Sequence, residues 1–163
     1  MKSAISTSKT SSHNGGSHCY GNEQSGKRIY MNGEKNLDVL LQRLRPKLNE
    51  GEYVFCHVND KQPFDLKNVI GSFREEEGLT VIIPKQLADE RQHEYSFVAS
   101  WITIMVHSSL EAVGLTAAFS TALSDAGISC NVIAAFYHDH IFVDSKDANR
   151  AMEVLKQLSK SDD

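Results

Sequence analysis

The sequence predicts an α+β fold of two ferredoxin-like units of the βαββαβ type, each an antiparallel sheet with helices on one face. Residues 99–158 read as strand, helix, strand, strand and helix, which is most of one such unit. A second, less regular series of short strands and helices precedes it. The chain has 163 residues, 40% of them hydrophobic, and can therefore build the cores that two small units need.

Composition argues against several classes of function. The net charge is −4 and the isoelectric point about 6.0, with no dominant basic patch, which disfavours nucleic-acid binding. No apolar run approaches the ~20 residues of a membrane helix. The cysteines Cys19, Cys56 and Cys130 are far apart and odd in number, as is typical of reduced thiols. We therefore expect a cytoplasmic protein that binds neither nucleic acid nor membrane.

The N-terminal residues differ from the rest. Met1–Gly33 contains seven serines and five glycines, with few aliphatic residues and no helical or strand period. Such a segment buries too little apolar surface to offset the entropy of ordering. The sequence therefore predicts a disordered tail over 1–34, a first unit over 35–94 and a second unit over 95–163. A targeting role for the tail remains open, although it lacks an Arg-rich amphipathic helix.

Five leucines open the first unit, and their spacing matches one face of a helix. The stripe runs from Leu37 to Leu48, with Pro46 inside it expected to kink the helix or end it early. Gly51 stops it. The elements expected next are a strand Tyr53–Val58, a polar connection Asn59–Arg74, a strand Leu79–Ile83 and a short helix over 85–92.

The second unit is more regular. A long strand over 97–107 leads through a polar loop to an amphipathic helix that begins after Gly114 and ends at Gly127. Strands over 128–136 and 140–144 and a final helix from Asp147 follow. Each half thus has two strands in a row followed by a helix, which suggests an internal duplication visible in element order and not in matching residues.

Gly114 also predicts a binding site. The N-terminus of a helix presents unpaired N–H groups and a partial positive charge to an anion. A residue without Cβ lets a ligand approach the backbone closely. The expected ligand group is a carboxylate, although Gly114 could instead allow close packing of the helix on the strand.

Several motifs in these segments resemble those of one family. Val113–Ile128, with the glycine at its start and Ala-Gly-Ile at its end, is similar to the opening of an ACT domain. Ile133–Val143 and Glu77–Ile82 fit the same pattern. The resemblance covers about 37–158 and points to tandem ACT-like small proteins related to the CASTOR-type amino-acid sensors.

The resemblance implies a regulatory module that binds an amino acid where two units meet and has no catalytic activity or cofactor of its own. It further implies a homodimer and a separate protein partner whose activity is regulated. In this sequence the backbone of the strand-to-helix loop would hold the ligand, and the following strand and hairpin would line it. The implied ligand-binding residues are Ser108, Ser109, Val113, Gly114, Leu115, Ala135, Phe136 and Asp139. Asp139 matches an acidic residue of the arginine sensors, which would suit a cationic ligand group.

Three other readings remain open. His138 and His140 could bind a metal with His107 or Cys130. General acid–base chemistry could use His107, His138 and Glu111, although no known catalytic motif is present.

The third reading is a ligand-free oligomerisation module. The second unit has a semi-polar sheet face at Trp101, Thr103 and Asn131 that could form its contact. No metabolite would then change the protein's stability.

Overall fold

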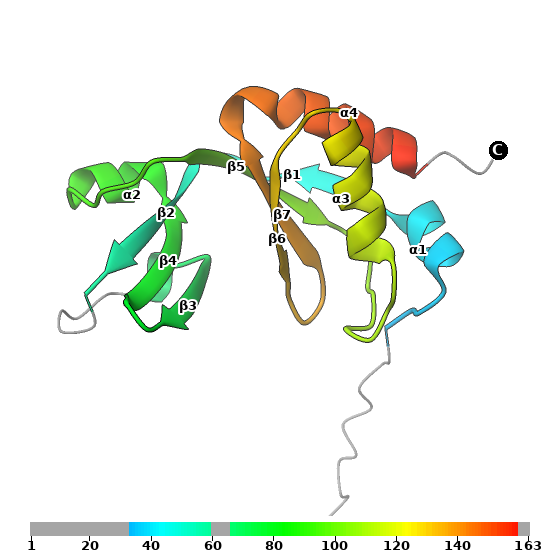
Figure 1. Cartoon of the computed structure of the whole chain (residues 1–163), viewed down its shortest axis with the longest axis horizontal. Coiled ribbons are helices and arrows are strands. Elements are labelled where there is room, and N and C mark those ends of the chain that lie inside the picture. The colour runs from blue at the N-terminus through cyan, green and yellow to red at the C-terminus, as the bar shows by residue number, and fades with distance from the viewer. Residues whose placement is uncertain (1–32, 60–65, 160–163) are drawn as a thin grey trace, which may run out of the picture. The chain divides into compact units, whose positions relative to one another are not determined.

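The computed structural model describes residues 33–59 and 66–159, which build a seven-stranded antiparallel sheet with helices packed on it (Figure 1). The predicted tail falls almost entirely outside these residues. The helices are α1 (Leu37–Arg43), α2 (Lys85–Glu90), α3 (Leu115–Asp125) and α4 (Ala148–Leu158), with 3-10 turns η1 (Leu66–Asn68) and η2 (Ser145–Asp147). The strands are β1 (Pro46–Leu48), β2 (Tyr53–Val58), β3 (Gly71–Glu75), β4 (Gly78–Pro84), β5 (Val98–Ile104), β6 (Cys130–Ala134) and β7 (Asp139–Asp144).

One strand belongs to both ferredoxin-like units. The sheet order is β3-β4-β2-β5-β7-β6, with β1 also paired to β5. The strands β3, β4, β2 and β5 form one four-stranded antiparallel set, and β1, β5, β7 and β6 form the other. The predicted α+β class and antiparallel pairing are therefore confirmed, with β5 as the shared strand.

The strands β1 and β2 occupy the same edge of β5 one after the other. Leu48 lies opposite Ile102, and Tyr53 lies opposite Ala99. Between them Asn49 turns inward, where its side-chain amide donates to the Trp101 carbonyl at 3.1 Å. The two short strands act as one interrupted strand that serves both units.

The predicted helix through Leu48 was wrong in its second half. The helix α1 ends at Arg43, and Pro46 begins β1 instead. Proline lacks the N–H that a helix interior needs and disfavours helical backbone before it. Leu48 matched the helical spacing, yet it lies in a strand and is 38% exposed.

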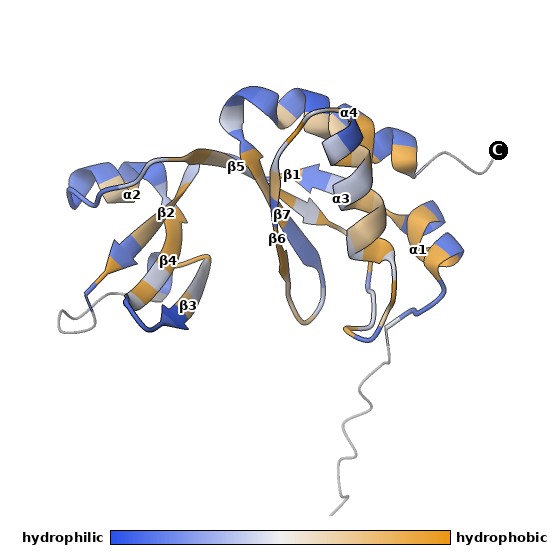
Figure 2. Cartoon of the chain, viewed as in Figure 1, coloured by the Kyte–Doolittle hydropathy of each residue, from blue (hydrophilic) through white to orange (hydrophobic). Residues whose placement is uncertain are grey.

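The helix α1 packs on the core of the second unit. Leu40 and Leu44 are fully buried in the cluster that contains Phe119 of α3 and Leu155 of α4. The helices α3 and α4 pack on one another over β5 and β7 (Figure 1), and Figure 2 shows hydrophobic and hydrophilic residues alternating along α4. The predicted boundary between 94 and 95 stays a prediction. The helix α1 precedes this boundary in the sequence, yet it packs on the core of the second unit.

The polar connection predicted over Asn59–Arg74 was also wrong at its end. It contains β3, four of whose five residues are exposed, so the strand lacks the apolar alternation that would reveal it. The turn into β4 needs Gly78, which has φ +144° and would place a Cβ 2.4 Å from Nε2 of His57. The repeated pairs before a helix are therefore β3–β4 and β6–β7, and not β2–β4 as the sequence suggested.

The remaining predicted elements are present with shifted ends. The strand expected over 97–107 stops at Ile104, and the one expected over 128–136 covers only Cys130–Ala134. Among the described residues, the helices are all too short to cross a bilayer.

Candidate functional site

The site is built around the connection between β5 and α3. The helix begins at Leu115 with Gly114 as its N-cap, in a left-handed conformation at φ +99° and without a side-chain cap. The first hydrogen bond of the helix is the one from the Ala118 N–H to the Gly114 carbonyl. The N–H groups of the first turn therefore have no partner within the helix and are available to an anion.

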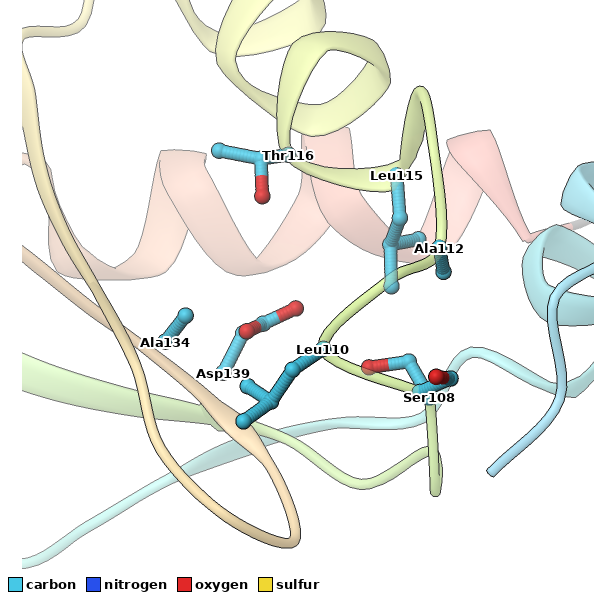
Figure 3. Close-up of a pocket in the computed structure, with 8 residues that line it drawn as sticks. Ser108, Leu110, Ala112, Leu115, Thr116, Ala134 and Asp139 are labelled. Atoms are coloured by element: carbon cyan, nitrogen blue, oxygen red, sulfur yellow. The ribbon is translucent and has the colours of Figure 1, made fainter. Parts of the chain in front are cut away.

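A cavity of about 50 Å³ lies beside this helix start (Figure 3). The loop before α3, the first residues of α3 and the two strands of the β6–β7 hairpin form its walls. The lining residues are Ser108, Ser109, Leu110, Ala112, Leu115, Thr116, Ala134 and Asp139. The volume exceeds the room for a single water, about 10–15 Å³, by several-fold.

Asp139 is the charged group of the cavity. It is 5% exposed, which is rare for a carboxylate without a partner. Among the described residues, no group donates a hydrogen bond to this carboxylate or pairs with it. Burial raises the pKa of Asp139, and the charge of His138 opposes this increase only in part.

A hydroxyl group faces the same space. Figure 3 shows the Thr116 hydroxyl directed from the start of α3 toward the side where Asp139 lies, while Ser108 lines the cavity from the loop. The Ser109 hydroxyl instead accepts from the Glu111 N–H at 3.2 Å and so stabilises the turn of the loop. The cavity thus combines anion-binding donors at one wall with an unpaired carboxylate at the other.

Four of the eight residues implied by the family resemblance line the cavity: Ser108, Ser109, Leu115 and Asp139. Gly114 lies next to it as the helix cap. A Cβ at Gly114 would approach Cδ2 of Leu37 to 3.0 Å, so this glycine also serves close packing of α1.

The other three implied residues are not among those that line it. Val113 is 84% exposed. Ala135 donates its N–H to the His138 carbonyl within the hairpin turn, and Phe136 is 58% exposed with its ring against Tyr137.

Sequence reasoning missed Leu110, Ala112, Thr116 and Ala134. The alternation of β6 carries a signal for one of them, because Cys130, Val132 and Ala134 share a face and the first two pack on the helix-covered core. Thr116 follows directly from Leu115 in the first turn of α3.

The residues of the metal and acid–base readings do not form one cluster. No cluster of three metal-ligating side chains occurs within the parts of the chain that the structure describes. Glu111 pairs with Lys35 at the surface, and the His107 ring lies 5.8 Å from that of Tyr137. His138 Nδ1 lies 3.3 Å from the Val106 carbonyl oxygen. His140 lies on the other face of the sheet, where its Nδ1 accepts from Trp101.

Comparison with known families agrees with this topology. Residues 32–100 match one model of the ACT domain, and residues 96–157 match a second ACT model. The two matches overlap at 96–100, which includes the start of the shared strand β5. No curated protein matches the chain.

Solved structures extend the comparison. A protein of unknown function from Vibrio cholerae, described as a possible transport protein, is 48% identical with a TM-score of 0.69. The match covers 77% of this chain and 97% of that one. A protein from Agrobacterium tumefaciens is 18% identical, with a TM-score of 0.54 over 72% of this chain and 90% of that one. The ligand-free regulatory subunit of aspartate kinase from Thermus thermophilus is 11% identical, with a TM-score of 0.52 over 69% and 95%. The last two likenesses show the fold alone.

Proposed function

We propose that this chain, which belongs to the ACT domain family and carries two such domains in tandem, is a regulatory module that binds a small amino acid. The ligand lies in the cavity between the start of α3 and the β6–β7 hairpin. The observation that carries the proposal is the buried, unpaired carboxylate of Asp139 facing an uncapped helix N-terminus.

Opposite charges on the two walls select a zwitterion. The partial positive charge of the helix start favours a carboxylate, and its free N–H groups can donate to both carboxylate oxygens. The charge of His138 offsets the burial of Asp139 only in part, so an ammonium group beside the carboxylate would reduce the remaining cost of burying it. The α-carboxylate of an amino acid therefore lies at Leu115 and Thr116, and its α-ammonium at Asp139.

The size of the cavity supports a small ligand. About 50 Å³ suits the α-amino and α-carboxyl groups and little more. The ligand's side chain then lies toward the open side of the cavity. That side determines which amino acid is preferred.

Exposed apolar residues support a homodimer that covers the open side. Leu110 and Val113 of the loop are 67% and 84% exposed, and Phe136 and Tyr137 of the hairpin are 58% and 61% exposed. Large apolar side chains gathered in two neighbouring loops mark an interaction surface. A second copy placed here completes the cavity, as the family resemblance implies.

The protein itself has no catalytic activity under this proposal. The groups suited to acid–base work, His107, His138 and Glu111, are absent from the lining of the cavity. A regulated activity would belong to a separate protein partner. The free thiols of Cys56 and Cys130 support a cytoplasmic location.

A thermal-shift screen against the twenty amino acids, confirmed by calorimetry, tests the proposal. A ligand at ~100 times its Kd adds about 2.7 kcal/mol to the free energy of unfolding. Asp139→Asn should lose the shift, whereas Asp125→Asn, an exposed carboxylate at the far end of α3, should keep it. A silent panel together with a stable dimer would instead favour the ligand-free oligomerisation module.

A further inference from the structure

A short segment before α1 lies against the loop that forms the cavity wall. The Glu34 N–H donates to the His107 carbonyl at 3.0 Å, and the Ser109 N–H donates to the Glu34 carbonyl at 2.9 Å. These two bonds form a parallel bridge between Glu34 and Ser108. The loop is thereby held on both sides of Ser108, which lines the cavity together with Ser109.

Gly33 sets how close this contact can be. A Cβ at Gly33 would lie 2.3 Å from the Ser109 nitrogen and 2.4 Å from the Ser108 carbonyl carbon. Both atoms belong to the backbone, so no side-chain movement relieves the overlap. Any residue other than glycine here must push the segment and the loop apart.

The same segment is anchored on its other side. The Glu34 carboxylate accepts from the N–H groups of Lys35 and Asn36, at 2.8 and 2.9 Å. The Asn36 side chain caps α1 by accepting from the Val39 N–H. Lys35 also pairs with Glu111 in the loop. The segment thus connects α1, which is fixed in the core, to the cavity loop.

We infer that Gly33–Lys35 is a clasp that positions the cavity loop and thereby sets the affinity of the site. This inference rests on the proposed function for its consequence. None of the clasp residues lines the cavity. They act through Ser108 and Ser109, because the bridge from Glu34 fixes the backbone of this loop. The positions of α3 and Asp139 are fixed separately by the core.

Amide hydrogen exchange tests the clasp without a ligand. Gly33→Ala should speed exchange of the Ser109 N–H by about tenfold, the effect of losing one ordinary hydrogen bond. Gly71→Ala is the matched control, because its Cβ would lie at an ordinary 3.5 Å from Ile82. It should leave Ser109 unchanged. Unchanged exchange at Ser109 in Gly33→Ala, with the variant folded, overturns the inference.

The ion pair allows a rescue experiment. Lys35→Glu and Glu111→Lys should each speed exchange over 107–112, by up to about fivefold for an exposed pair. The double variant that exchanges the two charges should restore the wild-type rate. A double variant that exchanges faster than either single one contradicts a role for this contact in the clasp.

The consequence for binding needs one amino acid as probe, namely the one with the largest thermal shift in wild type. Gly33→Ala should weaken its calorimetric affinity about tenfold or more, while exchange in α3 and α4 stays as in wild type. Equal affinity in Gly33→Ala and wild type would overturn the positioning role even where Ser109 exchanges faster. If none of the twenty amino acids shifts the melting temperature, the proposed function is contradicted. The hydrogen-exchange comparison of Gly33→Ala with wild type then still tests whether the clasp positions the loop.

Discussion

Asp139 lies directly opposite Ala134 in the ladder between β6 and β7, and both residues line the cavity at the start of α3. The pairing register of β6 and β7 places the Asp139 carboxylate in this cavity. Since side chains alternate along a strand, a slip of one residue would turn Asp139 to the face where His140 meets Trp101. The register therefore holds in the cavity a buried carboxylate without a hydrogen-bond or ion-pair partner among the described residues.

A first prediction concerns the stability of the protein without ligand. Asp139→Asn should raise the free energy of unfolding by about 1 kcal/mol, because a neutral amide is cheaper to bury than an unpaired carboxylate. Urea denaturation at neutral pH measures it. A decrease of that size would mean that the carboxylate stabilises the fold, and the reading of Asp139 as a ligand-binding group would fail.

The pH dependence of stability follows from the same group. Burial raises the pKa of Asp139 above its ordinary 3.8, so the native state holds this proton more tightly than the unfolded chain. Its contribution to stability is therefore full below about pH 3.8 and is lost as pH rises through the raised folded pKa. Wild type compared with Asp139→Asn should show this loss as a widening difference that levels off at higher pH. A constant difference across the range would contradict it.

The glycines at the two ends of α3 give a matched pair. Gly114 and Gly127 have φ of +99° and +69°, so alanine at either should destabilise the protein by ~1 kcal/mol or more. A Cβ at Gly114 would also lie 3.0 Å from Leu37, whereas one at Gly127 meets only Arg150 at 3.7 Å. Gly114→Ala should therefore also weaken amino-acid binding, and Gly127→Ala should not. Calorimetry on both variants decides; equal affinities would separate Gly114 from the site.

A histidine on the open sheet face predicts loss of stability in acid. Trp101 Nε1 donates to His140 Nδ1 at 3.0 Å, which requires that nitrogen to be unprotonated. Burial lowers the pKa of His140 below its ordinary 6.5. Stability should accordingly fall as pH drops from about 6.5 through the lower folded pKa. His140→Asn should show a smaller fall over this range, followed by the fluorescence of Trp101 during denaturation; an identical fall would exclude His140 as its source.

The position of α1 predicts which core it stabilises. Leu40→Ala should cost about 2–5 kcal/mol, because the side chain is fully buried against α3 and α4. Leu41→Ala on the same helix should lower the free energy of unfolding by less, because Leu41 is only half-buried. Hydrogen exchange near the unfolding midpoint should show α3 and α4 losing protection in Leu40→Ala. Loss confined to β2, β3 and β4 would contradict the shared core.

The sequence was most informative where local patterns and tertiary packing agree. In α3 the spacing of Leu115, Phe119 and Leu123 matches the buried face, and glycines flank both helix ends. The strand β2 has the predicted bounds for the same reason, since its residues alternate into the core. Pattern failed at β3, whose exposed residues resemble a loop until the ladder with β4 is known.

The candidate site divides in the same way. Gly114 indicated the helix start, and Asp139 came from the family resemblance, but the hairpin wall was placed one residue late at Ala135 instead of Ala134. The clasp left no local signal, because Gly33 belongs to no periodic pattern and its contact with Ser109 spans the whole of the predicted first unit. Such contacts depend on the shared strand β5, which no single segment reveals.

A calorimetric titration with three related compounds tests the central claim most directly. The amino acid selected by the screen is compared with its decarboxylated amine and its deaminated acid, on wild type and on Asp139→Asn. If the helix start binds the carboxylate and Asp139 the ammonium, only the intact amino acid binds wild type tightly, and Asp139→Asn loses that advantage. Equal binding of the deaminated acid and the amino acid to wild type would contradict the assignment of Asp139 and with it the proposed site.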